Sequence, residues 1–178
     1  MIVAIGGPPG SGKSTTAELY AKTYDCALVS AGAIFREQAG TRRMSLEEFG
    51  TYAESHPEVD RFLDDEVIVR VTSLSRLRDV VSEGRLQAAL FARRKIPALK
   101  VLVDAPILVR AERVAERDSL LAGEAHRQIV AREASERTRY LRLYGVDAND
   151  PSHYDLILDS SRLLPAEIVS AIRKKAKE

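Results

Sequence analysis

A glycine-rich motif near the N-terminus constrains this chain more than any other feature. Residues 7–14 read Gly-Pro-Pro-Gly-Ser-Gly-Lys-Ser and match the pattern G-x-x-x-x-G-K-[ST] without a mismatch. The motif follows a short β-branched run, Ile2–Ile5, and precedes a helical pattern that starts at Lys13. A strand–loop–helix unit of this kind presents backbone N–H groups and a helix N-terminus to an anion. The motif therefore predicts a site for a nucleoside triphosphate.

The residue types in this loop suit a phosphate ligand. Glycines let successive backbone N–H groups point inward, where larger side chains would obstruct them. We expect Lys13 to reach the β- and γ-phosphates, the Ser14 hydroxyl to bind Mg²⁺, and Thr15 to contact the α-phosphate. The loop residues expected to bind ATP are Gly7, Pro8, Pro9, Gly10, Ser11, Gly12, Lys13, Ser14 and Thr15.

Apolar runs of strand length recur along the chain and alternate with helical patterns. After the first run they lie at Ala27–Val29, Val80–Val81, Val101–Val103 and Leu156–Leu158. Short continuous runs are typical of strands that a parallel sheet buries on both faces. Ser45 and Glu48 form a capping-box pattern, and Pro106 and Pro165 are each placed as a first helical residue. The alternation predicts an α/β fold with a doubly wound five-stranded parallel sheet.

One stretch departs from this alternation. Between Gly32 and Asp79, about 45 residues of helix-like sequence contain no strand. A plain crossover connection needs only about a dozen residues. We interpret the stretch as a helical insertion on the sheet, within a single domain.

Composition excludes several classes of protein. The 178 residues include 27 basic and 26 acidic side chains, for a formal net charge of +1, so no global attraction to nucleic acid or membranes follows. No apolar run approaches the about 20 residues of a membrane span. The single cysteine, Cys26, excludes an internal disulfide and fits a reducing compartment. We therefore expect a cytoplasmic protein with no nucleic-acid or membrane partner, and a monomer.

The type of phosphate-loop protein can be narrowed further. A GTPase would carry Asn-Lys-x-Asp to read guanine, but the only asparagine is Asn149, which is followed by Asp150. A mechanical ATPase is usually longer and has an Asp-terminated apolar strand with a neighbouring catalytic glutamate. The small size of this chain favours a kinase of small molecules.

Several segments occur in a specific order and spacing after the phosphate loop. They are Ser30–Arg36, Ser45–Phe49, Glu83–Leu86, Leu99–Val101, Ala105-Pro106, Val109–Arg113, Arg132–Tyr140, Tyr144–Asp147 and Tyr154–Leu156. With these segments the chain resembles nucleoside monophosphate kinases nearly end to end, and most closely the cytidylate kinases of the type found in archaea. The resemblance implies one kinase domain, 1–178, with a core of 1–30, 79–120 and 154–178. It also implies a monophosphate-binding insertion at about 31–78 and a helical lid at about 121–153.

The acceptor site is expected where the strands end. Ser30, Gly32 and Arg36 follow a strand, and ligands of open α/β sheets bind at the carboxyl ends of strands. Gly32 allows close backbone approach, and Arg36 can grip a phosphate bidentately. The resemblance implies that Arg36 and Arg85 hold the acceptor phosphate. Glu83 ends a strand beside the phosphate loop, where its carboxylate could hold a Mg²⁺-bound water.

The chain departs from many relatives just after this point. It has Gln87-Ala88 where they have Ala-Gly, which leaves the contacts beyond Leu86 open.

Two further arginines belong to the expected donor site. Arg113 and Arg117 are four residues apart and share a helix face. The resemblance implies that Arg113 lies flat on the donor adenine and that Arg117 reaches the donor phosphates. The alternative is a solvated charged helix, with Glu112 and Glu116 as partners of the arginines.

A charged helix from Ala122 to about Leu143 contains the expected lid residues. Arg132, Glu136 and Arg139 correspond to the lid of the family, and seven residues place the two arginines on one helix face. Closed over the transferred phosphoryl group, they would stabilise its charge. The alternative is a set of exposed pairs such as Glu133–Arg137. The expected catalytic residues are Lys13, Arg132 and Arg139.

The resemblance implies transfer of a phosphoryl group from ATP to CMP or dCMP, with Mg²⁺. The attacking phosphate oxygen is already ionised, so no general base is needed. A carboxylate would favour the amino group of cytosine over the carbonyl of uracil. Asp60, Asp64 and Asp65 lie in the insertion, and Asp60 is the first candidate. A different acceptor, such as AMP or UMP, and a non-enzymatic nucleotide-binding regulator or assembly factor remain open alternatives.

Overall fold

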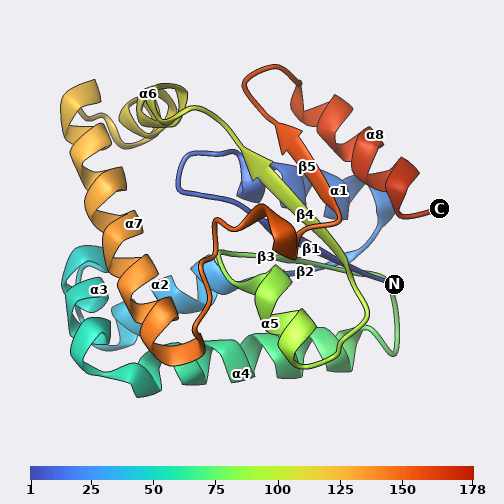
Figure 1. Cartoon of the computed structure of the whole chain (residues 1–178), viewed down its shortest axis with the longest axis horizontal. Helices are drawn as coiled ribbons and strands as arrows, with labels where there is room; N and C mark the ends of the chain where they lie inside the picture. Colours follow the sequence, from blue (N-terminus) through green and yellow to red (C-terminus); the bar gives the residue numbers. More distant parts are fainter.

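A five-stranded parallel sheet forms the centre of the molecule (Figure 1). The computed structural model describes residues 1–178. The strands are β1 (Ile2–Gly6), β2 (Ala27–Ser30), β3 (Val80–Glu83), β4 (Leu99–Asp104) and β5 (Leu156–Asp159), and they lie in the order β2-β3-β1-β4-β5. Because all pairs are parallel, the carboxyl ends of the strands meet at one edge of the sheet. The predicted α/β architecture is confirmed.

Helices cover both faces of this sheet. They are α1 (Lys13–Tyr24), α2 (Ala31–Thr41), α3 (Leu46–Ser55), α4 (Pro57–Leu74), α5 (Gln87–Arg93), α6 (Ile107–Asp118), α7 (Ala122–Tyr144) and α8 (Pro165–Lys175), with the short 3₁₀ helix η1 (Pro151–His153) before β5. Side chains alternate along β1: Val3 and Ile5 pack with α1 and α8, whereas Ile2 and Ala4 pack with α4 and α5. Each face of the sheet therefore has its own hydrophobic core.

Local sequence signals set several helix boundaries. The Ser45 hydroxyl accepts a hydrogen bond from the N–H of Glu48 at 3.2 Å, and the Glu48 carboxylate accepts from the N–H of Ser45 at 2.7 Å, as the capping-box pattern predicts. Pro165 begins α8 as expected. Pro106 does not begin α6: its backbone is extended, with ψ of 142°, and the first helical residue is Ile107. Proline fixes φ but leaves ψ free, so the residue can also precede a helix.

The insertion and the long charged helix lie side by side. No strand interrupts the three helices α2, α3 and α4 between β2 and β3. Helix α7 packs on α6 through an apolar cluster that includes Ala111, Val114, Ala125 and Ile129. Its C-terminal half runs past α3 and toward α4, away from the sheet (Figure 1). No helix is both long enough and apolar enough to span a membrane.

Phe91 lies in the hydrophobic core between the sheet and α5, and its removal should destabilise the protein. Phe91 is fully buried in the core cluster that β1, α4 and α5 share, whereas the side chain of Phe62 on α4 is 51 % exposed. We expect Phe91→Ala to lower the free energy of unfolding by about 3–5 kcal/mol, because it leaves a cavity. Phe62→Ala should change it by about 0.5 kcal/mol or less. Urea unfolding measures both, and equal losses would contradict this assignment of the core.

Candidate active site

The phosphate loop, 7–14, connects β1 to α1 at the carboxyl edge of the sheet. Gly10 has a φ of 79°, and a Cβ there would lie 2.6 Å from the backbone oxygen of Arg110, so only glycine fits. The N–H groups of Gly10, Gly12 and Lys13 donate to no backbone acceptor. Free N–H groups at a helix N-terminus form an anion site. The loop therefore has the geometry that a phosphate ligand requires.

Lys13 lies between the loop and β3. Its Nζ is 3.4 Å from the carbonyl oxygen of Pro8. Burial lowers the pKa of Lys13 to about 8, and the negative charge of Glu83 partly opposes this change. The hydroxyl-bearing residues Ser14 and Thr15 follow at the exposed start of α1.

Glu83 and the start of α2 converge beside the loop. Glu83 is buried at the end of β3, where it accepts a hydrogen bond from the Ser30 hydroxyl, and that hydroxyl caps α2 by accepting from the N–H of Ala33 at 3.0 Å. A Cβ added to Gly32 would lie 3.4 Å from Nη1 of Arg36 and 3.8 Å from Oε1 of Glu83. Arg36 is exposed and forms no ion pair. Its guanidinium is therefore available to an anion at this edge.

A buried carboxylate joins two of the expected arginines. Glu136 on α7 accepts from Nε of Arg85 at 2.7 Å and from Nε of Arg132 at 2.8 Å. Burial alone would raise the pKa of Glu136, but the charges of Arg132 and Arg85 hold it below its ordinary value. Nη2 of Arg85 donates to Asn149 at 3.2 Å, whereas its Nη1 is buried without a partner. An unpartnered buried donor marks a place for an acceptor group.

Arg139 is paired with an acid of the helical insertion. Its Nη1 donates to Oδ1 of Asp60 at 2.6 Å, and the two side chains are only 5 % and 6 % exposed. Burial raises the pKa of Asp60, and Arg139 opposes that rise. Oδ2 of Asp60 and Nε of Arg139 are both buried without a partner. The structure thus pairs two residues that the sequence assigned to different tasks, one on α4 and one on α7.

The other two candidate acids have partners away from this site. Asp64 accepts from the hydroxyl of Tyr144 at 2.5 Å, and burial raises its pKa to about 7. Asp65 is exposed and pairs with Arg94 at 2.5 Å. Of the three acids considered from the sequence, only Asp60 pairs with a buried arginine of α7.

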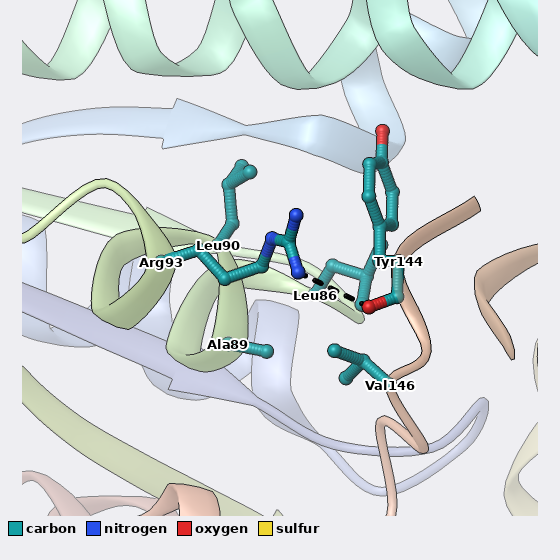
Figure 2. A pocket seen from close by; sticks show the side chains of 6 residues that line it. All are labelled: Leu86, Ala89, Leu90, Arg93, Tyr144 and Val146. Atoms are coloured by element: carbon teal, nitrogen blue, oxygen red, sulfur yellow. Dashed lines mark hydrogen bonds between the residues drawn. The ribbon is translucent and has the colours of Figure 1, made fainter.

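The end of α7 is fixed to the core next to a small apolar pocket. Figure 2 shows Arg93 of α5 donating to the backbone oxygen of Tyr144, a bond of 3.1 Å, while the Tyr144 hydroxyl points away from the pocket. The guanidinium of Arg93 also lies 5.6 Å from the centre of the Tyr144 ring. Leu86, Ala89 and Val146 complete the contact. The helix is thereby held at both the core and the insertion.

The two arginines of the expected donor site have different surroundings. Arg113 donates from Nη1 to the Ser160 hydroxyl at 2.9 Å and from Nη2 to the Ser160 carbonyl at 2.8 Å, and it lies 3.5 Å from the carbonyl of Gly10. Arg117 instead forms two 2.7 Å hydrogen bonds with Asp118 and is largely exposed. The structure brings Arg113 to the phosphate loop and leaves Arg117 outside it.

Sequence reasoning missed two residues that contact the loop. Arg110 is buried and donates to the carbonyl of Pro9 at 3.2 Å, and the Ser160 hydroxyl donates to the carbonyl of Ser11 at 2.7 Å. Ser160 directly follows β5, so its place at the carboxyl edge of the sheet was a usable signal. Arg110 gave no such signal, because one more arginine on a charged helix resembles a surface residue.

The lowered pKa of Lys13 predicts proton uptake when ADP binds. At pH 8.5 most of the free protein should carry a neutral Lys13, and a bound phosphate restores its charge. We expect uptake of more than about half a proton per site, and an ADP affinity that falls as the pH rises above 8. Calorimetry in buffers of different ionisation enthalpy measures this uptake. Lys13→Arg stays charged and should show none; binding without uptake in the unchanged protein would contradict the prediction.

Solved structures with the same fold include kinases. An uncharacterised protein from Eubacterium ventriosum superposes with a TM-score of 0.73 at 16 % identity, covering 100 % of this chain and 99 % of that one. A shikimate kinase from Bacteroides thetaiotaomicron superposes with a TM-score of 0.62 at 12 % identity, again over 100 % and 99 % of the two chains. At this level of identity the likeness concerns the fold alone.

Relatives found by sequence share a much larger fraction of identical residues with this chain than these solved structures do. A cytidylate kinase of Pyrococcus abyssi is 44 % identical over 173 residues, which cover 97 % of this chain and 92 % of that protein. A cytidylate kinase of Methanocaldococcus jannaschii is 41 % identical over 163 residues, which cover 91 % and 89 %. Residues 2–162 match the Cytidylate kinase-like family. This chain therefore belongs to that family.

Proposed function

We propose that this chain is a cytidylate kinase that transfers the γ-phosphoryl group of ATP to CMP or dCMP, giving ADP and CDP or dCDP. One observation carries the proposal most directly: the phosphate loop has free N–H groups, and its Lys13 lies near a second cluster of cations that includes Arg85 and Arg132. The family and its curated relatives, which are named cytidylate kinases, support the same reaction. A protein that only binds ATP would not need a second phosphate-binding site.

Two groups of residues divide the work of binding. The loop residues 7–15 hold the donor phosphates, with Lys13 neutralising charge that develops between donor and acceptor. Ser30, Gly32, Arg36 and Arg85 form the acceptor-phosphate site. The unpartnered Nη1 of Arg85 supports that assignment, because a phosphate oxygen would satisfy it.

Catalysis then rests on position and charge. The acceptor phosphate is ionised at neutral pH, so no side chain needs to remove a proton. Arg132, joined through Glu136 to Arg85, comes from the lid helix toward the acceptor phosphate. Lys13 and Arg132 would stabilise the equatorial oxygens of the transferred group. Closure by α7 would exclude water, which otherwise competes as the acceptor.

The residues beside the loop fit a magnesium ion. The Ser14 hydroxyl and the Glu83 carboxylate are oxygen donors, as Mg²⁺ prefers, and Glu83 would act through a water. No cluster of three acidic, histidine or cysteine side chains could hold the ion by itself, so nucleotide oxygens would supply most ligands. When bound, the ion would neutralise phosphate charge and orient the γ-phosphoryl group.

We assign the adenine of ATP to a position next to Arg113. This guanidinium lies 3.5 Å from the Gly10 carbonyl of the phosphate loop and is held by two hydrogen bonds to Ser160. A planar cation fixed in this way can stack on a base. Arg117 would have to leave Asp118 to reach the donor phosphates, so its role in ATP binding depends on a side-chain rearrangement.

We assign recognition of the acceptor base to Asp60 and Arg139 together. Oδ2 of Asp60 is an acceptor without a donor, and Nε of Arg139 is a donor without an acceptor. Cytosine offers an amino donor next to the N3 acceptor, which complements this pair. Uracil reverses both positions, with a carbonyl next to N3–H. On this assignment Arg139 acts on the base rather than on the transferred phosphoryl group.

The reaction is tested by ADP release from ATP·Mg²⁺ with CMP, dCMP, UMP, AMP or GMP in turn. We expect strong stimulation by CMP and dCMP alone, and little ADP release without an acceptor, because closure keeps water out. Preference for AMP or UMP would retain a nucleotide kinase and remove the base assignment. Absence of stimulation by any monophosphate would favour a nucleotide-binding regulator.

The base assignment is tested by Asp60→Asn. Losing a charged acceptor should raise the KM for CMP at least about tenfold while the KM for ATP changes little. The new amide can donate to the uracil carbonyl, so the ratio of UMP to CMP activity should rise. Asp65→Asn is the matched control, because Asp65 is an exposed acid on the same helix. An unchanged KM for CMP in a folded Asp60→Asn protein would remove Asp60 from the base site.

A further inference from the structure

We propose that Arg110 is a positioning residue that sets the conformation of the phosphate loop and connects the loop to the lid helix α7. The activity measurements below rest on the proposed kinase function. The principal measurement, ADP binding, does not depend on the acceptor.

Arg110 touches three parts of the structure from a nearly buried position. Its side chain is 9 % exposed, and its Nε donates to the carbonyl of Ala105 at 2.9 Å, which fixes the guanidinium against the end of β4. Nη1 donates to the carbonyl of Pro9 in the phosphate loop at 3.2 Å. The same nitrogen donates to Oε1 of Glu133 on α7 at 2.5 Å. Arg110 therefore lies between loop and lid.

The contact with Pro9 determines where a loop N–H points. In a trans peptide the C=O and the following N–H point in opposite directions. When Arg110 holds the Pro9 carbonyl toward α6, the N–H of Gly10 must point to the other side of the loop. That N–H has no acceptor within the backbone. Arg110 thus keeps one donor of the anion site oriented before any phosphate arrives.

A second residue acts on the loop in the same way. The Ser160 hydroxyl donates to the carbonyl of Ser11 at 2.7 Å, and the next N–H, that of Gly12, also lacks a backbone acceptor. Along the loop, the two carbonyls that accept these side-chain hydrogen bonds alternate with N–H groups that have no backbone acceptor. Only the Arg110 contact extends to α7, because Ser160 is held by Arg113 on α6.

Glu133 supplies the connection to the lid. It lies one residue after Arg132 and one turn before Glu136, on the helix that carries the acceptor-side arginines. Its carboxylate forms a charge-assisted bond with Arg110, a stronger type of hydrogen bond than a neutral one. A movement of α7 therefore displaces a partner of the guanidinium that orients the loop. This gives the donor and acceptor sites a direct physical link.

The test compares Arg110→Met, Arg110→Lys and Glu133→Gln with the unchanged protein, using calorimetry with ADP and with CMP. We expect Arg110→Met to weaken ADP binding at least about tenfold and to change CMP binding less than about twofold. Arg110→Lys should recover only part of the ADP affinity, because one ammonium lacks the planar fork that reaches three carbonyl and carboxylate groups. Arg70→Met is the control, since Arg70 forms an exposed pair on α4.

Glu133→Gln weakens the contact between Arg110 and α7 but leaves the contact between Arg110 and the phosphate loop. It should leave ADP affinity within about threefold, because Arg110 keeps Pro9, and lower kcat several-fold at saturating substrates. Equal weakening of ADP and CMP in Arg110→Met would indicate general destabilisation and overturn the proposal. If that variant does not fold, full ADP affinity in Arg110→Lys, or an unchanged kcat in Glu133→Gln, overturns it instead. An unchanged protein that binds ADP but phosphorylates no monophosphate would refute the kinase function and leave the ADP comparison valid.

Discussion

Glu136 accepts a hydrogen bond on each carboxylate oxygen, one from Arg85 on the core and one from Arg132 on helix α7. Lys13, Arg36 and these two arginines gather at one edge of the sheet, where their like charges would otherwise repel. A buried carboxylate between two of them compensates that repulsion and is itself compensated by two partners. Because Glu136 itself lies on α7 and Arg85 belongs to the core, the position of α7 depends on this group of charges.

Ion pairs also attach other parts of α7 to neighbouring elements. Glu133, Glu136 and Arg139 make ion pairs with residues of three different elements: α6, the segment after β3, and α4. Removing one partner from a buried pair typically costs about 3–5 kcal/mol, because the other charge is left uncompensated. Apolar contacts hold α7 mainly at its start, on α6, and near its end, on the segment around Leu86. Charges therefore fix the middle of the helix, where Arg132 and Arg139 lie.

Sequence reasoning predicted the scaffold well because the scaffold follows from local patterns. The phosphate loop, the β-branched runs, the capping box at Ser45 and the strandless insertion each depend on a few neighbouring residues. Most partners of the arginines do not follow from such patterns. Arg132 pairs with Glu136 one turn further along α7, as helical spacing allows. Arg139 instead meets Asp60, which lies in a distant part of the chain. Arg110 was missed because burial of an arginine depends on tertiary packing.

On the proposed base assignment, the pairing of Asp60 with Arg139 connects base choice to closure. One residue comes from the insertion and the other from the lid helix, so the pair forms only when α4 and α7 lie together. A cytosine that satisfies both unpartnered atoms would bridge the two elements, whereas a uracil would place like groups opposite each other. Discrimination would then arise as the site closes rather than from a preformed pocket. The wrong base would destabilise the closed state. This is also the state that excludes water and permits phosphoryl transfer.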